Sequence, residues 1–307
     1  MNAAAAITAA IRSRSRFLAG LACFALGEVQ AGGSGLPTLP GHQTLPRVVR
    51  AEQDASVFGM GRSRASSRLR LYVLTSDRSR WQFVAVLPGQ PAEPLPASTA
   101  VFALNAHDLW WNVTLGSVAN VAVNSLYRSS DGGRHWRLTN SNTLHGRVGS
   151  GIVPDWIQTQ RVFMDGRHGW FVSAGLEDAG LRVQRTADGG STWNASPLPL
   201  FSRTDVASRP LVFVFGKSAV VTALTFGGTM HSRPTLRTFL TRDGGVSWSA
   251  QPSLALKPGQ ITDVPQQVVF LSPTDGLALL GGASYRTQDA GKHWQLIRAS
   301  EGSRNSN

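Results

Sequence analysis

Carboxylates are the residues of this chain that could carry acid–base chemistry, and most of them recur in repeated turns. A glycoside hydrolase needs two carboxylates that flank the scissile bond, but a catalytic acid is not normally repeated once per structural unit. We therefore interpret the repeated aspartates as structural; they are Asp77, Asp131, Asp188, Asp243 and Asp289 in one motif, and Asp54, Asp108, Asp165 and Asp275 in another. After residue 31, the acids outside these turns are Glu52, Glu93, Asp155, Glu177, Asp178, Asp205, Asp263 and Glu301.

Other residue types offer less chemistry. Cys23 is the single cysteine, and the chain contains neither a Gly-x-Ser-x-Gly nor a His-Glu-x-x-His motif. The tyrosines Tyr72, Tyr127 and Tyr285 fall on expected strands and do not fit the tyrosine nucleophile that sialidases use. The seven histidines are scattered. The sequence therefore predicts no metal site and no cofactor.

The first motif reads Ser/Thr-x-Asp-x-Gly-x-x-Trp and occurs at 129–136, 186–193, 241–248 and 287–294, with a decayed copy at 75–81. In such a turn the aspartate accepts hydrogen bonds from backbone N–H groups a few residues on, and glycine adopts positive φ. The tryptophan covers the hairpin with a large apolar surface. Each copy therefore predicts a self-capped β-hairpin.

The spacing of the motif predicts the architecture. Its tryptophans recur at intervals of about 50 residues, and an apolar strand, a turn and a second apolar strand precede each copy. A repeat four strands long is typical of a propeller blade. We expect an all-β propeller of about five four-stranded antiparallel blades, with the motif between the third and fourth strands; the expected blades span 46–87, 98–139, 160–197, 210–251 and 267–299. Six blades are possible if a degenerate unit lies in a long loop.

The motif resembles the Asp-box, or BNR repeat, of sialidases, sortilin-like receptors and photosystem II assembly factors. The segment 185–190, Arg-Thr-Ala-Asp-Gly-Gly, is most similar to the photosystem II assembly/stability factor type and its bacterial relatives. The resemblance covers about residues 46–299. It implies a non-catalytic exported propeller that binds partner proteins and helps assembly.

Candidate binding residues lie in the unrepeated connections. In a propeller, the loops between blades and those between the second and third strands share the face opposite the Asp-box turns. Here we expect 198–209 to be a loop between blades and 112–122 to be a loop between second and third strands. On that face we expect a ligand-binding site formed by Asp155, Trp156, Arg203, Asp205, Arg209, His231 and Arg233. Trp156 could stack on a sugar or anchor a peptide, or it could simply plug the channel rim.

The N-terminus predicts export. Arg12, Arg14 and Arg16 precede a short apolar stretch, and Ala31 offers a cleavage site, so residues 1–31 are expected to be a signal peptide. A lipoprotein modified at Cys23 is the alternative. We expect a flexible linker at 32–45, the propeller at 46–299 and a disordered tail at 300–307, in a periplasmic or secreted protein without a transmembrane segment in its mature form.

The formal net charge is +12, carried almost entirely by arginine. Arginine suits carboxylate, sulfate and phosphate groups because it can bind them bidentately. Since an exported protein rarely meets nucleic acid, the expected partner of this monomer is a protein or an anionic glycan. The first functional hypothesis is a non-catalytic binding or assembly propeller. The alternatives are a glycan-acting enzyme, such as a divergent sialidase or glycosidase, and a carbohydrate-binding propeller.

Overall fold

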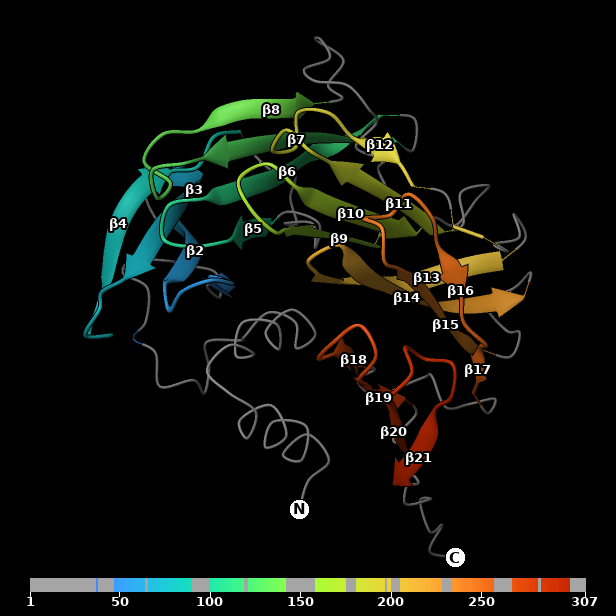
Figure 1. Cartoon of the computed structure of the whole chain (residues 1–307). Coiled ribbons are helices and arrows are strands. Elements are labelled where there is room, and N and C mark those ends of the chain that lie inside the picture. Colours follow the sequence, from blue (N-terminus) through green and yellow to red (C-terminus); the bar gives the residue numbers. More distant parts are fainter. Residues whose placement is uncertain are drawn as a thin grey trace, which may run out of the picture.

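The computed structural model describes residues 37, 47–63, 66–89, 100–118, 121–141, 158–174, 181–196, 198–199, 205–227, 234–256, 267–280 and 283–298. All regular structure in these residues is β-strand, and the strands form five antiparallel sheets. The sheets follow one another around a common axis, from blue to red in Figure 1. This arrangement confirms the expected all-β propeller, and we refer to the sheets as blades 1 to 5 in chain order.

The first three blades contain four strands each. Blade 1 consists of β1 (Arg47–Arg50), β2 (Val57–Ser63), β3 (Ser66–Leu74) and β4 (Trp81–Val86). Blade 2 consists of β5 (Ala100–Ala103), β6 (Leu109–Val118), β7 (Val121–Ser129) and β8 (Arg137–Ser141). Blade 3 consists of β9 (Gln158–Phe163), β10 (Gly169–Ala174), β11 (Leu181–Thr186) and β12 (Asn194–Ala195).

The last two blades keep the same strand order. Blade 4 consists of β13 (Asp205–Phe215), β14 (Ser218–Gly227), β15 (Thr235–Thr241) and β16 (Ser249–Ala250), with β17 (Leu254–Ala255) also pairing with β15. Blade 5 consists of β18 (Gln267–Phe270), β19 (Gly276–Leu280), β20 (Ala283–Thr287) and β21 (Gln295–Arg298). Blade 5 therefore supplies its own fourth strand.

Two expected loops are strands. The segment 112–122 was expected to be a loop, but β6 continues to Val118 and β7 begins at Val121. The paired residues of this extended hairpin include Val113, Val118, Val121 and Val123, and such β-branched residues suit a strand. The connection expected at 198–209 likewise ends early, because β13 begins at Asp205 and pairs with β14 from that residue.

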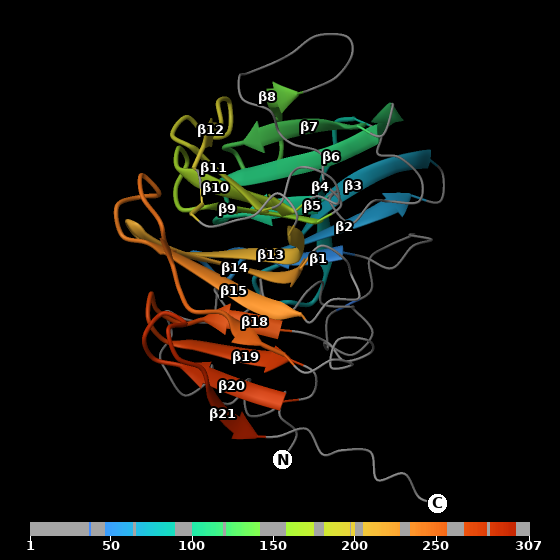
Figure 2. The ribbon, with the colours of Figure 1, turned by 90° about the vertical axis from the view of Figure 1, so that its right-hand side faces the viewer.

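The two repeated turns of a blade lie together on one face. The first turn joins strands one and two, and the Asp-box turn joins strands three and four. In four blades a backbone N–H of the Asp-box turn donates to a carbonyl of the first turn, at N···O distances of 2.7–3.0 Å: Gly132 to His107, Gly189 to Arg167, Gly244 to Lys217 and Ala290 to Thr274. We call this side the Asp-box face. In Figure 2 the strands of neighbouring blades run side by side across the view.

The core lies between blades. Apolar clusters join blade 1 to blade 2, blade 2 to blade 3, blade 3 to blade 4, and blade 4 to blade 5. Trp110 of blade 2 stacks on Phe163 of blade 3, with ring centroids 3.8 Å apart and planes 9° from parallel. Each blade therefore buries its faces against its neighbours, as expected for sheets that cannot bury both faces alone. Within the described ranges, no helix combines the length and apolarity needed to cross a membrane.

Candidate functional site

The Asp-box aspartates are held inside their own turns. Asp188 Oδ1 accepts from the Thr186 hydroxyl at 2.8 Å and from the Thr192 N–H at 2.8 Å, and its Oδ2 accepts from the Thr192 hydroxyl at 2.7 Å. Burial alone would raise the pKa of Asp188, but these hydrogen bonds outweigh it, and the pKa is lowered. The Asp188 carboxylate therefore stays ionised and stabilises its own hairpin turn.

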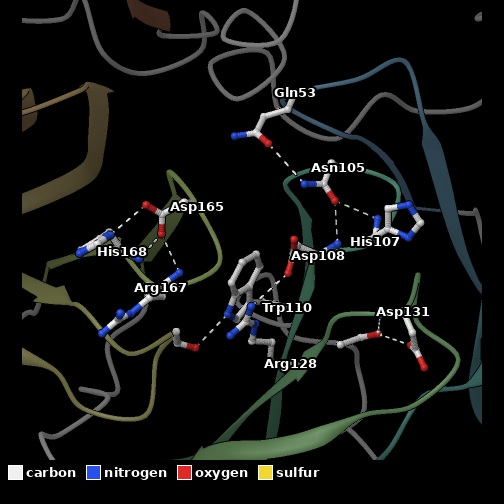
Figure 3. Close-up of polar contacts among 12 residues, drawn as sticks. Gln53, Asn105, His107, Asp108, Trp110, Arg128, Asp131, Asp165, Arg167 and His168 are labelled. Atoms are coloured by element: carbon white, nitrogen blue, oxygen red, sulfur yellow. Dashed lines mark hydrogen bonds and ion pairs between the residues drawn. The ribbon is translucent and has the colours of Figure 1, made fainter.

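Histidine caps three of the repeated aspartates. The histidine Nδ1 atom lies 2.6 Å from the carboxylate in the pairs His135–Asp131 and His293–Asp289, and 2.9 Å in the pair His168–Asp165. Asp165 also accepts from the N–H groups of Arg167 and His168 at 2.6 and 2.7 Å. Figure 3 shows His168 and Arg167 beside Asp165, with dashed lines from both residues to its carboxylate. Burial alone would raise the pKa of Asp165, but the hydrogen bonds from His168 and Arg167 outweigh burial and lower the pKa below its ordinary value. Asp165 is therefore ionised at neutral pH.

Two further aspartates pair with arginine. Asp108 lies 3.1 Å from Arg128 in blade 2, and Asp275 lies 3.3 Å from Arg286 in blade 5. Arg128 also covers the ring of Trp110, with its guanidinium carbon 5.3 Å from the ring centroid. These pairs fasten the third strand of a blade to its first turn, so they are structural.

Glu52 lies in the first turn of blade 1, two residues before Asp54. It is the second residue after the end of β1, and its N–H donates to the Ala103 carbonyl of blade 2 at 3.1 Å. Its side chain is half-buried, and its Oε1 atom is buried with no hydrogen-bond partner in the described structure. Burial raises the pKa of Glu52 to about 8. At neutral pH this carboxyl group is therefore predominantly protonated.

Gln53 joins the turn of Glu52 to two other blades. Its Nε2 donates to the Met164 carbonyl of blade 3 at 3.1 Å, and its Oε1 accepts from Asn105 Nδ2 of blade 2 at 3.3 Å. Figure 3 shows Gln53 between Asn105 and the turn that carries Asp165. The protonated acid of blade 1 and the ionised Asp165 of blade 3 thus sit on turns that are hydrogen-bonded to each other.

A groove of about 940 Å³ lies between blades 3 and 4 on the Asp-box face. Met164 lies in its wall, so the groove reaches the turn that Gln53 contacts. Its lining residues are Met164, Asp165, His168, Gly169, Trp170, Arg185, Thr186, Ala187, Asn194, Gly216, Lys217, Arg242, Asp243 and Gly244. The groove therefore brings together the side chains of Arg185, Lys217 and Arg242. Within the described residues, no group of three or more His, Cys, Asp or Glu side chains could hold a metal ion.

The site expected from the sequence is not tested by this geometry. Asp155, Trp156, Arg203, His231 and Arg233 lie outside the described residues. Asp205 and Arg209 lie on β13 rather than in a loop, and the structure describes only their backbone. The binding role of these residues stays a prediction.

Sequence reasoning missed Glu52 and the groove as candidate sites. Glu52 belongs to the weakest copy of the first turn, and its one signal was that no repeat required it. The groove had a second signal in Lys217, because the turn Gly216-Lys217-Ser218 departs from the aspartate-bearing turns of the other blades.

No protein-family model and no curated protein matches the chain. Among solved structures, an oligogalacturonate lyase in complex with manganese has a TM-score of 0.55 at 8% identity, covering 86% of this chain and 66% of the other. A Penicillium chrysogenum α-L-arabinanase complexed with arabinobiose has a TM-score of 0.48 at 15% identity, covering 83% and 80%. A PL25 ulvan lyase has a TM-score of 0.43 at 10% identity, covering 82% and 69%. At these identities the likeness shows the propeller fold.

The comparison corrects the first functional hypothesis. The prediction of a non-catalytic propeller that binds a partner protein is corrected by this comparison, because the three structures named above are an arabinanase and two lyases. No assembly factor is among those named neighbours, and the similarity to photosystem II factors stays a resemblance of sequence motifs. The glycan-acting alternative remains as the hypothesis to test.

Proposed function

We propose that this chain acts on a glycan, with Glu52 as the proton-donating acid. The observation that carries the proposal is a half-buried carboxyl group whose pKa is raised to about 8 and whose buried Oε1 atom has no hydrogen-bond partner in the described structure. Glycosidic cleavage needs a protonated carboxylic acid to donate to the leaving-group oxygen. An acid with a pKa near the operating pH combines a large protonated fraction with an effective proton transfer.

The ionised Asp165 is the proposed second carboxylate. Two carboxyl groups whose surroundings push their pKa values in opposite directions can take the acid and the anionic roles at the same pH. Glu52 is raised by burial, whereas Asp165 is lowered by hydrogen bonds from His168 and Arg167. The hydrogen bond from Gln53 to the Met164 carbonyl links their turns. In this scheme Asp165 stabilises positive charge that develops at the sugar, a water molecule adds to the anomeric carbon, and the proton that this water loses restores the carboxyl group of Glu52.

The test is an activity screen with a matched variant. The purified chain is incubated with neutral and acidic polysaccharides, and new reducing ends are measured for the wild type, Glu52→Gln and Asp77→Asn. Asp77 is an exposed Asp-box aspartate of the same blade. We expect cleavage by the wild type and by Asp77→Asn, and a loss of about 100-fold or more in Glu52→Gln, because general acid catalysis contributes on that order.

Two results would overturn the proposal. One is a Glu52→Gln variant that melts like the wild type and retains full activity. The other is a wild type that binds a glycan but releases no products from any polysaccharide tested, which would favour a carbohydrate-binding propeller.

A further inference from the structure

The groove between blades 3 and 4 results from a local departure from the repeat. In blades 2 and 5 the residue before the second strand is Asp108 or Asp275, and this acid pairs with the arginine of the third strand. Strand register places His168 at the corresponding position of blade 3, because Gly169 pairs with Thr186 as Leu109 pairs with Ser129. The arginine itself is retained as Arg185, opposite Trp170.

Arg185 therefore has no carboxylate partner in the described structure. Its one hydrogen bond there runs from Nη1 to the Gly244 carbonyl of blade 4 at 2.9 Å. A guanidinium group has five N–H donors in a planar fork, so most of the donors of Arg185 stay available to a ligand. The bond to Gly244 fixes the side chain in the groove wall, which lowers the entropic cost of binding.

Blade 4 adds two cations and an open wall. Lys217 and Arg242 are exposed groove residues, and no described carboxylate pairs with them. A Cβ atom built on Gly216 or Gly244 would meet no atom within 4 Å, so a ligand could approach the backbone there. At the junction of blades 2 and 3, by contrast, Arg128 fills the space over Gly189, with its Nη1 atom 2.8 Å from a Cβ built there.

The two acids that line the groove are engaged elsewhere. Asp243 accepts from the hydroxyls of Thr241 and Ser247 at 2.8 and 2.6 Å, and Asp165 is bound by His168 and the backbone of its own turn. Their oxygens therefore satisfy local donors, while the donors of Arg185, Lys217 and Arg242 are the groups left for a ligand.

We propose that this groove is a subsite for an acidic sugar, whose carboxylate or sulfate group binds Arg185, with Lys217 and Arg242 adding charge. Arginine binds such planar or tetrahedral oxyanions bidentately, and two further cations strengthen the site. The inference deepens the proposed function, on which it rests, by giving the glycan an anionic class. Met164 connects the groove to the turn that Gln53 of blade 1 contacts.

The experiment measures binding separately from turnover. Calorimetric titration of the full chain uses trigalacturonate, a sulfated disaccharide, inorganic sulfate and a neutral galactose trimer. We expect an acidic sugar to bind and the neutral trimer to bind at least about tenfold more weakly, since the charge-assisted contacts would be lost. The carboxylate and sulfate arms identify the preferred anion, and binding of inorganic sulfate alone would overturn the sugar subsite.

Variants locate the site. Arg185→Ala and Lys217→Ala should each weaken binding of the acidic sugar by about tenfold. Arg286→Ala, at the same repeat position in blade 5, should leave the affinity unchanged.

The double substitution Asp165→Asn with His168→Asp copies the Asn105 and Asp108 positions of blade 2 without changing the formal charge. We expect it to pair Arg185 and weaken binding, and unchanged affinity in Arg185→Ala would overturn the inference.

The outcomes for the two proposals are distinct. Binding that needs Arg185 but gives no cleavage would contradict only the enzymatic proposal. Glu52-dependent cleavage of neutral glycans, with no affinity for acidic sugars, would contradict only the groove.

Discussion

At the scale of single residues, Glu52 differs from the Asp-box residues Asp77 and Asp289, because its pKa is raised and theirs are lowered. Asp77 and Asp289 have pKa values lowered to about 2; hydrogen bonds from Thr75 and Ser79 cause the first, and those from His293 outweigh burial in the second. Glu52 has no comparable donors, so burial dominates. The same carboxyl group that suits proton donation must therefore cost stability when it ionises.

This cost predicts how stability depends on pH. The pKa of Glu52 rises from 4.5 to about 8 on folding, so the folded chain binds more protons between these values. The contribution of Glu52 to stability is full below pH about 4.5, falls as pH rises to about 8 and is constant above, for a total of at most about 4–5 kcal/mol. Glu52→Gln should remove this fall.

The measurement is the free energy of unfolding in urea at pH 5 and pH 8.5 for both proteins. The unfolding free energy of the variant minus that of the wild type should be larger at pH 8.5 than at pH 5. A pH dependence identical in the two proteins would show that Glu52 ionises normally.

At the scale of elements, each Asp-box turn stabilises its hairpin through satisfied backbone donors. Asp188→Ala would leave the Thr192 N–H without its acceptor in a partly buried turn. We expect a loss of about 1–3 kcal/mol in unfolding free energy, without a specific loss of activity. Thermal melting and the glycan assay check this together.

The matched control is Asp77→Ala in the decayed copy of blade 1, where the turn is exposed and water can replace the lost acceptor. It should destabilise the chain less than Asp188→Ala. An Asp188→Ala variant with normal melting but no activity would contradict the structural role of the turn.

The sequence predicted these elements because turn chemistry is local. The Asp-box boundaries, the strand pairs around them and the five blades follow from residues within about 50 positions of one another. Strand ends were predicted less well, because the length of a hairpin depends on cross-strand pairing. Gly116 and Ser117 pair with Val123 and Ala122, which extends the hairpin of β6 and β7.

The site was less predictable because it depends on register and on contacts between blades. His168 replaces the acid of blades 2 and 5 only when the strands are aligned by their pairing. Likewise, the burial of Glu52 depends on blade 2, which contributes the Ala103 and Leu104 carbonyls. Neither relationship is visible from spacing alone.

At the scale of the whole molecule, stability depends on packing between blades. Gly245 of blade 4 adopts φ +81°, and a Cβ atom there would lie 2.6 Å from Trp170 Cζ3 of blade 3. Neighbouring Gly244 has φ +73° but nothing within 4 Å of an added Cβ. Gly244→Ala should therefore cost only the conformational penalty of about 1–2 kcal/mol, whereas Gly245→Ala should cost about 1–3 kcal/mol more through overpacking.

Urea unfolding of the two alanine variants measures this difference. Equal losses at the two positions would contradict tight packing of blade 4 on Trp170.

Export and cleavage after Ala31 stay predictions, because residues 1–36 lie outside the described structure.

The central claim is that Glu52 is a protonated acid at neutral pH, and its pKa can be measured directly. The chain contains five glutamates, so a protein labelled with ¹³C at the glutamate carboxyl gives few signals, and the Glu52→Gln variant identifies the one from Glu52. We predict a midpoint near pH 8 for that signal, against about 4.3 for an ordinary glutamate. A midpoint between about 4 and 5 would contradict the account.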